Sequence, residues 1–79
     1  MKMNYPNGTR NIISAKVKSY RRKNGWTQKE LAEKLQLEGL QFSDLTILRI
    51  EKGERLVTDF ELKILAEVFA VHYEDLLDD

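Results

Sequence analysis

The reactive side chains of this chain do not form a catalytic set. The 79 residues include no cysteine and a single histidine, His72. There is no glycine-rich phosphate loop and no pair of helical carboxylates beside a base, so a nucleophile, a base and a group that orients the base cannot be assembled. The acidic pairs at 74–75 and 78–79 lack the spacing and the glycine of a calcium-binding loop. The sequence therefore predicts no enzyme, no metal site and no cofactor, and we interpret His72 as a helix cap or a surface group.

Basic side chains, in contrast, are concentrated in the first part of the chain. Residues 1–29 contain eight lysines and arginines and no acid, whereas residues 30–79 contain the other five basic residues and all thirteen acids, although the whole chain is neutral. This asymmetry indicates either a basic face for a polyanion or a charged surface that is merely solvated. The side chains suited to contact phosphate groups are Gln28, Lys29, Lys52, Arg55, Lys18 and Arg22.

Apolar residues recur at helical spacing from residue 13 onward. Ile13, Val17 and Tyr20 form a stripe at i, i+4 and i+7, which predicts a helix capped by Thr9 or Asn11 that ends near residue 24. We expect a flexible arm over residues 1–9, one domain over residues 10–77 and an acidic tail at 78–79.

Capping signals predict the starts of three further helices. Thr27 with Glu30, and Thr58 with Glu61, have the spacing of a capping box, and Ser43 offers a cap without the reciprocal acid. These signals predict helices that end at Gly39, near residue 52 and near residue 69. A fifth, short helix is expected over residues 73–77, with His72 as its cap. The predicted core residues of these helices are Leu31, Ala32, Leu35, Ile47, Ile50, Leu62, Leu65, Val68, Phe69, Leu76 and Leu77.

The stretch from Thr27 to Gly53 has the form of a helix-turn-helix. Two short amphipathic helices are joined by a turn that contains Gly39, and the second helix is shaped to enter a DNA major groove. Gln28 stands at the start of the first of these helices, where its amide and the free N–H groups can hold a phosphate, unless it is simply a surface helix former. The pattern favours sequence-specific DNA binding.

These residues resemble the Cro/C1-type, XRE-like helix-turn-helix family of repressors and small regulators. The matching pieces are Arg21, the segments 25–32 and 46–53, and the closing segment 70–77. The resemblance implies an all-α, compact, five-helix lambda-repressor-like domain. About five extra residues between Gln36 and Phe42 resemble a subgroup in which the second helix is lengthened.

The resemblance also implies roles for individual residues. Arg21 is expected to pair with Glu51, which would lock the first helix to the third and is a structural role. The positions that the resemblance assigns to base contacts are Ser43, Asp44, Leu45 and Arg49.

Alternatives stay open at several of these positions. Arg49 suits bidentate contact with guanine, or a salt bridge to Glu38 or Glu54. Asp44 stands where relatives of the subgroup commonly have a basic residue, and it either accepts from cytosine N4 or complements the helix dipole. Leu45 and Leu48 contact thymine methyls, bind a protein or fold partly into the core.

The function expected from this resemblance is a cytoplasmic, repressor-like transcriptional regulator that binds operator DNA as a homodimer. The dimer surface is expected at Tyr73, Leu77 and Phe69. The alternative is a protein-interaction or antitoxin-like module that uses the Leu45/Leu48 face. Neither reading involves a membrane or a small-molecule ligand.

Overall fold

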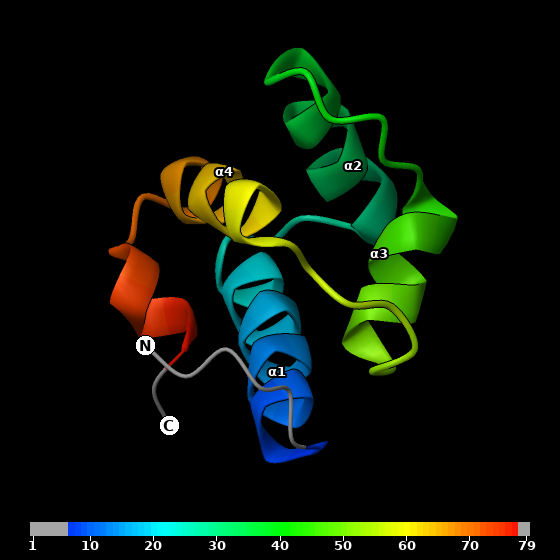
Figure 1. The fold of residues 1–79 in the computed structure, drawn as a ribbon. Helices are drawn as coiled ribbons and strands as arrows, with labels where there is room; N and C mark the ends of the chain where they lie inside the picture. Colours follow the sequence, from blue (N-terminus) through cyan, green and yellow to red (C-terminus); the bar gives the residue numbers. More distant parts are fainter. Residues whose placement is uncertain (1–6, 78–79) are drawn as a thin grey trace.

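The computed structural model describes residues 7–77, with side chains from residue 12 onward. Its elements are the α-helices α1 (Asn7–Lys23), α2 (Gln28–Leu37), α3 (Asp44–Glu51) and α4 (Asp59–Phe69) and the 3-10 helix η1 (Tyr73–Leu76) (Figure 1). The described residues contain no strand, so the expected all-α class is confirmed. Residues 1–6 of the expected arm and the acidic tail lie outside the described residues.

Two expectations about the ends of the chain are wrong. The first helix begins at Asn7, so Thr9 and Asn11 lie inside it, as do the last residues of the expected arm. Asparagine and threonine are favoured at helix starts but also tolerated in the first turn, so cap-type residues at 7, 9 and 11 do not fix the start.

The fifth element is a single 3-10 turn rather than an α-helix. The backbone N–H of Asp75 donates to the carbonyl of His72, and that of Leu77 donates to the carbonyl of Glu74, which is the tight i to i−3 pattern. His72 occupies the cap position, and its own backbone N–H donates to the carboxylate of Asp75. The turn therefore starts with a backbone donor and an acidic acceptor, not with the imidazole.

The predicted capping boxes at Thr27 and Thr58 are both confirmed. Ser43 also begins a capping box, in which the hydroxyl of Thr46 takes the place of the missing acid. The backbone N–H of Ser43 donates to Thr46 Oγ1 at 3.0 Å, and the N–H of Thr46 donates to Ser43 Oγ at 3.3 Å. The start of α3 is thus fixed by two hydroxyl groups.

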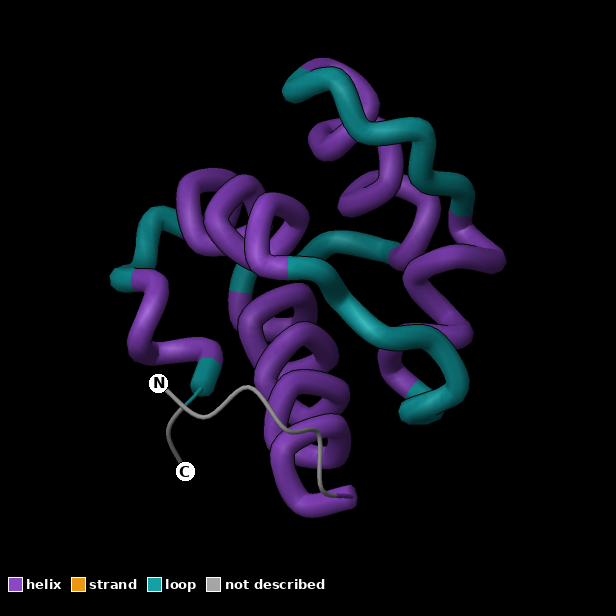
Figure 2. The backbone as a smooth tube through the Cα atoms, viewed as in Figure 1, coloured by secondary structure: helices purple, strands orange, loops and turns teal. Residues whose placement is uncertain are grey.

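The core lies where α1, α2, α3 and α4 meet. The predicted stripe residues are buried, except that Tyr20, Val68 and Leu77 are partly buried and pack against the core. Core residues that the helical period did not predict include Leu40, Phe42 and Val57, which lie in the connections shown in Figure 2. A period of 3.6 residues carries no information about connections. Phe42 and Val57 do have another signal, because each directly precedes a helix cap, where an apolar residue often packs on the first turn.

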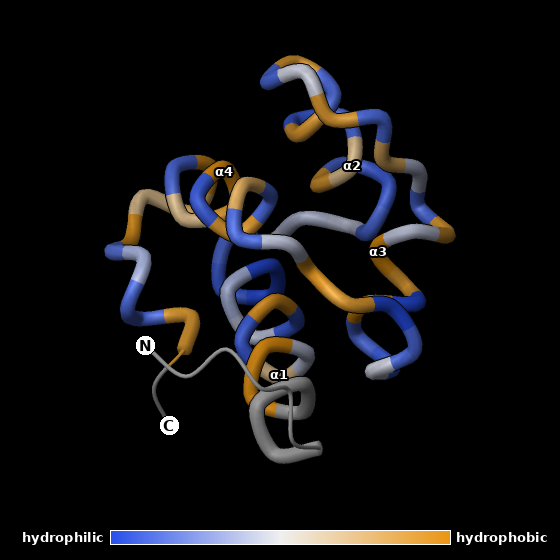
Figure 3. Tube along the Cα trace, in the orientation of Figure 1, coloured by the Kyte–Doolittle hydropathy of each residue, from blue (hydrophilic) through white to orange (hydrophobic). Residues whose placement is uncertain are grey.

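Packing places α3 at one edge of the molecule. It packs against both α1 and α2, while η1 lies at the opposite edge of the view and packs against α1 and α4 (Figure 1). The turn after α3 is strongly hydrophilic (Figure 3). No helix among the described residues is long and apolar enough to cross a membrane.

Candidate nucleic-acid interface

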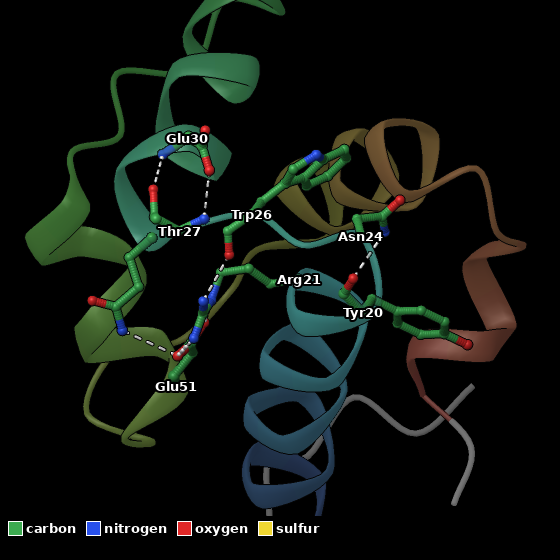
Figure 4. Close-up of polar contacts among 8 residues, drawn as sticks. Tyr20, Arg21, Asn24, Trp26, Thr27, Glu30 and Glu51 are labelled. Carbon is green, nitrogen blue, oxygen red and sulfur yellow. Dashed lines mark hydrogen bonds and ion pairs between the residues drawn. The ribbon is translucent and has the colours of Figure 1, made fainter.

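An ion pair between α1 and α3 fixes the position of α3. Arg21 Nε lies 2.6 Å from Glu51 Oε2, and Arg21 Nη2 donates to Glu51 Oε1 at 3.1 Å (Figure 4). The two side chains are only 12% and 3% exposed, so the pair is nearly dry. Its two parallel hydrogen bonds restrict both distance and orientation. The pair implied by the resemblance is therefore present and ties the last residue of α3 to α1.

The same charged group also reaches the start of α2. Arg21 Nη1 donates to the carbonyl of Trp26 at 2.9 Å (Figure 4). Gln28 Nε2 donates to Glu51 Oε1 at 3.1 Å, so its amide already has a structural role within the fold. The N–H groups of Glu30 and Leu31 are taken by the side chain and the carbonyl of Thr27. The first two N–H groups of α2, at positions 28 and 29, are therefore the ones available to an anion.

The start of α3 is occupied by its own side chains. In addition to the box between Ser43 and Thr46, Asp44 Oδ1 accepts from the backbone N–H of Leu45 at 2.8 Å. This bond matches the expectation that Asp44 complements the positive end of the helix. A phosphate at this helix start would meet a carboxylate and donors that are already paired.

The outer face of α3 consists of five exposed side chains. Ile47 and Ile50 are buried on the opposite side of the helix. Leu45 and Leu48 are 48% and 37% exposed, so they do not fold into the core. The members of this outer face, at helical spacings that share one side, are Asp44, Leu45, Leu48, Arg49 and Lys52.

A protein-family model described as Helix-turn-helix matches residues 17–76, which include all of α2, α3, α4 and η1. This chain belongs to the Cro/C1-type helix-turn-helix family. No individual curated protein and no solved structure matches it. The family is a DNA-binding type of domain rather than an enzymatic one.

Arg49 presents its guanidinium on the exposed side of α3. Among residues 12–77, no ion pair involves its guanidinium. Glu54, one of the two acids considered as its partner, instead lies 3.7 Å from Lys52 Nζ in a pair that is largely exposed and therefore weak. The salt bridge that was the alternative interpretation for Arg49 is not formed.

Arg55 has a different environment from the one expected for a phosphate contact. Its Nη1 and Nη2 donate to the two carboxylate oxygens of Glu61, each at 3.0 Å, and its guanidinium lies 4.8 Å from the centre of the Phe42 ring. The hydrogen bond to Glu61 raises the pKa of Arg55 above its usual value. Burial raises the pKa of Glu61, but hydrogen bonds from Arg55 and from the N–H of Thr58 outweigh it, so the pKa of Glu61 is lowered. Arg55 thus ties the connection after α3 to α4, which competes with a phosphate role.

The other expected phosphate contacts lie on the surface. Lys18, Arg22 and Lys29 are all exposed. Lys18 is three residues before Arg21, so the two are neighbours on the surface of α1, and Arg21 points toward α3. Lys18 and Arg22 are four residues apart and line one shallow depression. Lys52, also exposed, caps the end of α3, so exposed cations lie on α1, on α2 and at the end of α3.

The residues expected at a dimer surface differ in exposure. Phe69 is only 5% exposed, and its ring stacks against Trp26 and packs against Tyr20. Tyr73 and Leu77 are partly buried against the core. The aromatic cluster covers Phe69, while Tyr73 and Leu77 stay partly exposed. The large apolar side chains that are exposed among the described residues are Leu37, Leu45, Leu48, Leu56 and Phe60.

Proposed function

We propose that this protein is a sequence-specific, repressor-like transcriptional regulator that binds double-stranded DNA by placing α3 in the major groove. The observation that carries the proposal is the outer face of α3, the second helix of the helix-turn-helix. Its opposite side is buried, its end is held by the Arg21–Glu51 pair, and it presents Arg49 without an ion pair among the described residues. A helix supported in this way can enter a groove without losing its own packing.

Base reading would depend chiefly on Arg49. The guanidinium is the group best suited to the O6 and N7 acceptors of guanine. Ser43 is committed to the capping box, so a base contact from its hydroxyl would compete with the start of α3. Leu45 and Leu48 present methyl groups of the kind that pack on thymine C5-methyls. In this arrangement Arg49 and the leucines read bases.

Positioning on the duplex would come from the surrounding cations and from the start of α2. Lys29, Lys52, Lys18 and Arg22 are exposed and have the charge for phosphate contacts. The N–H groups of residues 28 and 29 add a helix N-terminus, and the Gln28 amide is held beside it by Glu51. We further propose that two copies bind a two-fold-related operator, as is usual for helix-turn-helix proteins.

Selection of bound sequences from a random duplex pool at about 50 mM salt tests this function. We expect the protein to select a motif, and Arg49→Ala to flatten the preference at one base pair per half-site with a cost of about 1–3 kcal/mol. Lys63→Ala removes the same charge from an exposed position of α4 and is the matched control. A wild-type protein that binds no duplex DNA would refute the proposal.

A second candidate function is a protein-interaction module, because two leucines of the outer face are exposed. Large apolar side chains that stand together on a surface are common at protein interfaces. This function would be favoured if duplex DNA does not bind at about 50 mM salt. If DNA binds and Leu45→Ala weakens it, the leucines belong to the DNA interface instead.

A further inference from the structure

The outer face of α3 changes from a hydrogen-bond acceptor at its start to hydrogen-bond donors at its end. It begins with an acceptor, Asp44, continues with the methyl groups of Leu45 and Leu48, and ends with two donors, Arg49 and Lys52. An ionised carboxylate only accepts hydrogen bonds, and guanidinium and ammonium groups only donate them. The two ends of the face therefore require opposite partners.

Within residues 12–77, one oxygen of the Asp44 carboxylate is engaged by the backbone, and the other is not. Its Oδ1 accepts from the N–H of Leu45 at 2.8 Å, while no hydrogen bond to Oδ2 is present among the described residues. Asp44 itself is exposed. In the major groove the only base donors are the N4 amino group of cytosine and the N6 amino group of adenine, whereas guanine and thymine present only hydrogen-bond acceptors. Every base pair has one amino-bearing base, so an acceptor at the leading end of α3 can discriminate between a base pair and its reverse, which places the amino group on the other strand.

Resting on the DNA-binding function proposed above, we propose that Asp44 is a specificity-determining residue that selects a cytosine or adenine amino group and excludes guanine and thymine from the base it faces. Arg49 reads a guanine toward the other end of the same half-site. Five residues separate the two side chains, a rise of about 7.5 Å along the helix, which corresponds to roughly two base-pair steps.

The same carboxylate also lowers binding to unrelated sequences. Non-specific binding depends almost entirely on the attraction between protein cations and phosphates. A negative charge on the outer face weakens this attraction at every site. The contact with an amino group compensates for the repulsion only at sites that have the right base. Asp44 thereby increases the ratio of specific to non-specific affinity while it decreases affinity overall.

The test compares wild type, Asp44→Asn and Asp59→Asn by selection from a random duplex pool, followed by competition binding. Asparagine has the shape of aspartate and keeps an oxygen for the N–H of Leu45, so α3 keeps its start. Its amide also donates, so it can contact guanine and thymine. Asp59 is the exposed first residue of α4, and its substitution makes the same change in charge at the same helix position away from α3.

We expect the wild-type motif to prefer one orientation of the base pair about two steps from the guanine that depends on Arg49, with cytosine or adenine on the strand that Asp44 faces. In Asp44→Asn this preference should fall at least about fivefold, with the reversed base pair accepted, and non-specific DNA should bind more tightly. Asp59→Asn should select the wild-type motif. Thermal unfolding of each variant shows that a changed motif does not come from a changed fold.

Two results would overturn the inference and leave the proposed function standing. One is an Asp44→Asn motif identical to that of wild type, and the other is a wild-type motif that accepts a base pair and its reverse equally at the position that Asp44 controls. A wild-type protein that binds no duplex DNA would instead overturn the proposed function, and this inference with it.

Discussion

At the scale of single residues, Ala70 is the backbone position under strain. It ends α4 with φ 59° and ψ 45°, the left-handed conformation, and it is the one non-glycine residue with positive φ among those described. Glycine takes this conformation without the steric penalty of a Cβ atom. The other helix ends with positive φ are glycines, at Gly25, Gly39 and Gly53.

Ala70→Gly is therefore expected to stabilise the protein, by up to about 1 kcal/mol. The gain is limited because glycine also increases the entropy of the unfolded chain. Ala15→Gly makes the same substitution at an exposed position inside α1 and should destabilise by roughly 0.5–1 kcal/mol. Urea unfolding of the two variants measures both effects, and a destabilised Ala70→Gly protein would contradict the strain argument.

Glu61 is the residue whose charge links stability to pH. Its pKa is lower in the folded protein than in the unfolded chain, because hydrogen bonds from Arg55 and the N–H of Thr58 outweigh burial. The unfolded state therefore binds more protons at acidic pH, and folding loses stability as the pH falls through the folded pKa. The contribution is fully present above the unfolded pKa, from about pH 5 upward.

We predict that the free energy of unfolding of Glu61→Gln falls less steeply than that of wild type between about pH 5 and pH 3. Urea unfolding across this range gives the two slopes. Glu67→Gln, at an exposed position of the same helix, is the control and should keep the wild-type slope. Equal slopes for Glu61→Gln and wild type would show that the Arg55–Glu61 pair does not contribute.

At the scale of elements, three helices are joined through one carboxylate. Glu51 at the end of α3 accepts from Arg21 of α1 and from Gln28 of α2. Both charged side chains are nearly buried, so removal of one leaves the other without a partner in a poorly solvated place. The relative placement of α1, α2 and α3 thus depends on this group more than on any surface charge.

Arg21→Ala should lower the free energy of unfolding by about 3 kcal/mol, because it strands a buried carboxylate. Arg22→Ala, at the exposed neighbouring position, should change it by less than about 0.5 kcal/mol. The double variant Arg21→Ala/Glu51→Ala should cost less than the sum of the single variants. Chemical denaturation of wild type, Arg21→Ala, Glu51→Ala, the double variant and Arg22→Ala measures these costs, and additive single costs would argue against a coupled pair.

At the scale of the whole molecule, the sequence predicted the features that depend on residues close together in the chain. The capping boxes at Thr27 and Thr58 and the stripe that contains Ile13 and Val17 are local patterns, and the structure contains them. The Arg21–Glu51 pair joins residues 30 positions apart, and it was expected only because of the family resemblance.

The parts that the sequence did not predict depend on contacts between distant elements. Nothing local distinguishes Arg55, which faces Glu61, from an arginine that is free to hold a phosphate. Phe69 carried no sign that Trp26 and Tyr20 would cover it. Thr46 was overlooked as the reciprocal group of Ser43 although the Ser-x-x-Thr spacing was visible, because the usual partner at that position is an acid.

The clamp at Glu51 has a consequence for how such a protein can change its target. The residues that hold α3 in place, Ile47, Ile50 and Glu51, are separate from the five that face outward. If the proposed function holds, substitutions among the outward five would alter recognition while the buried residues keep the geometry of the scaffold. A lineage, or a designer, could then exchange one binding preference for another on this scaffold without first having to recover lost stability.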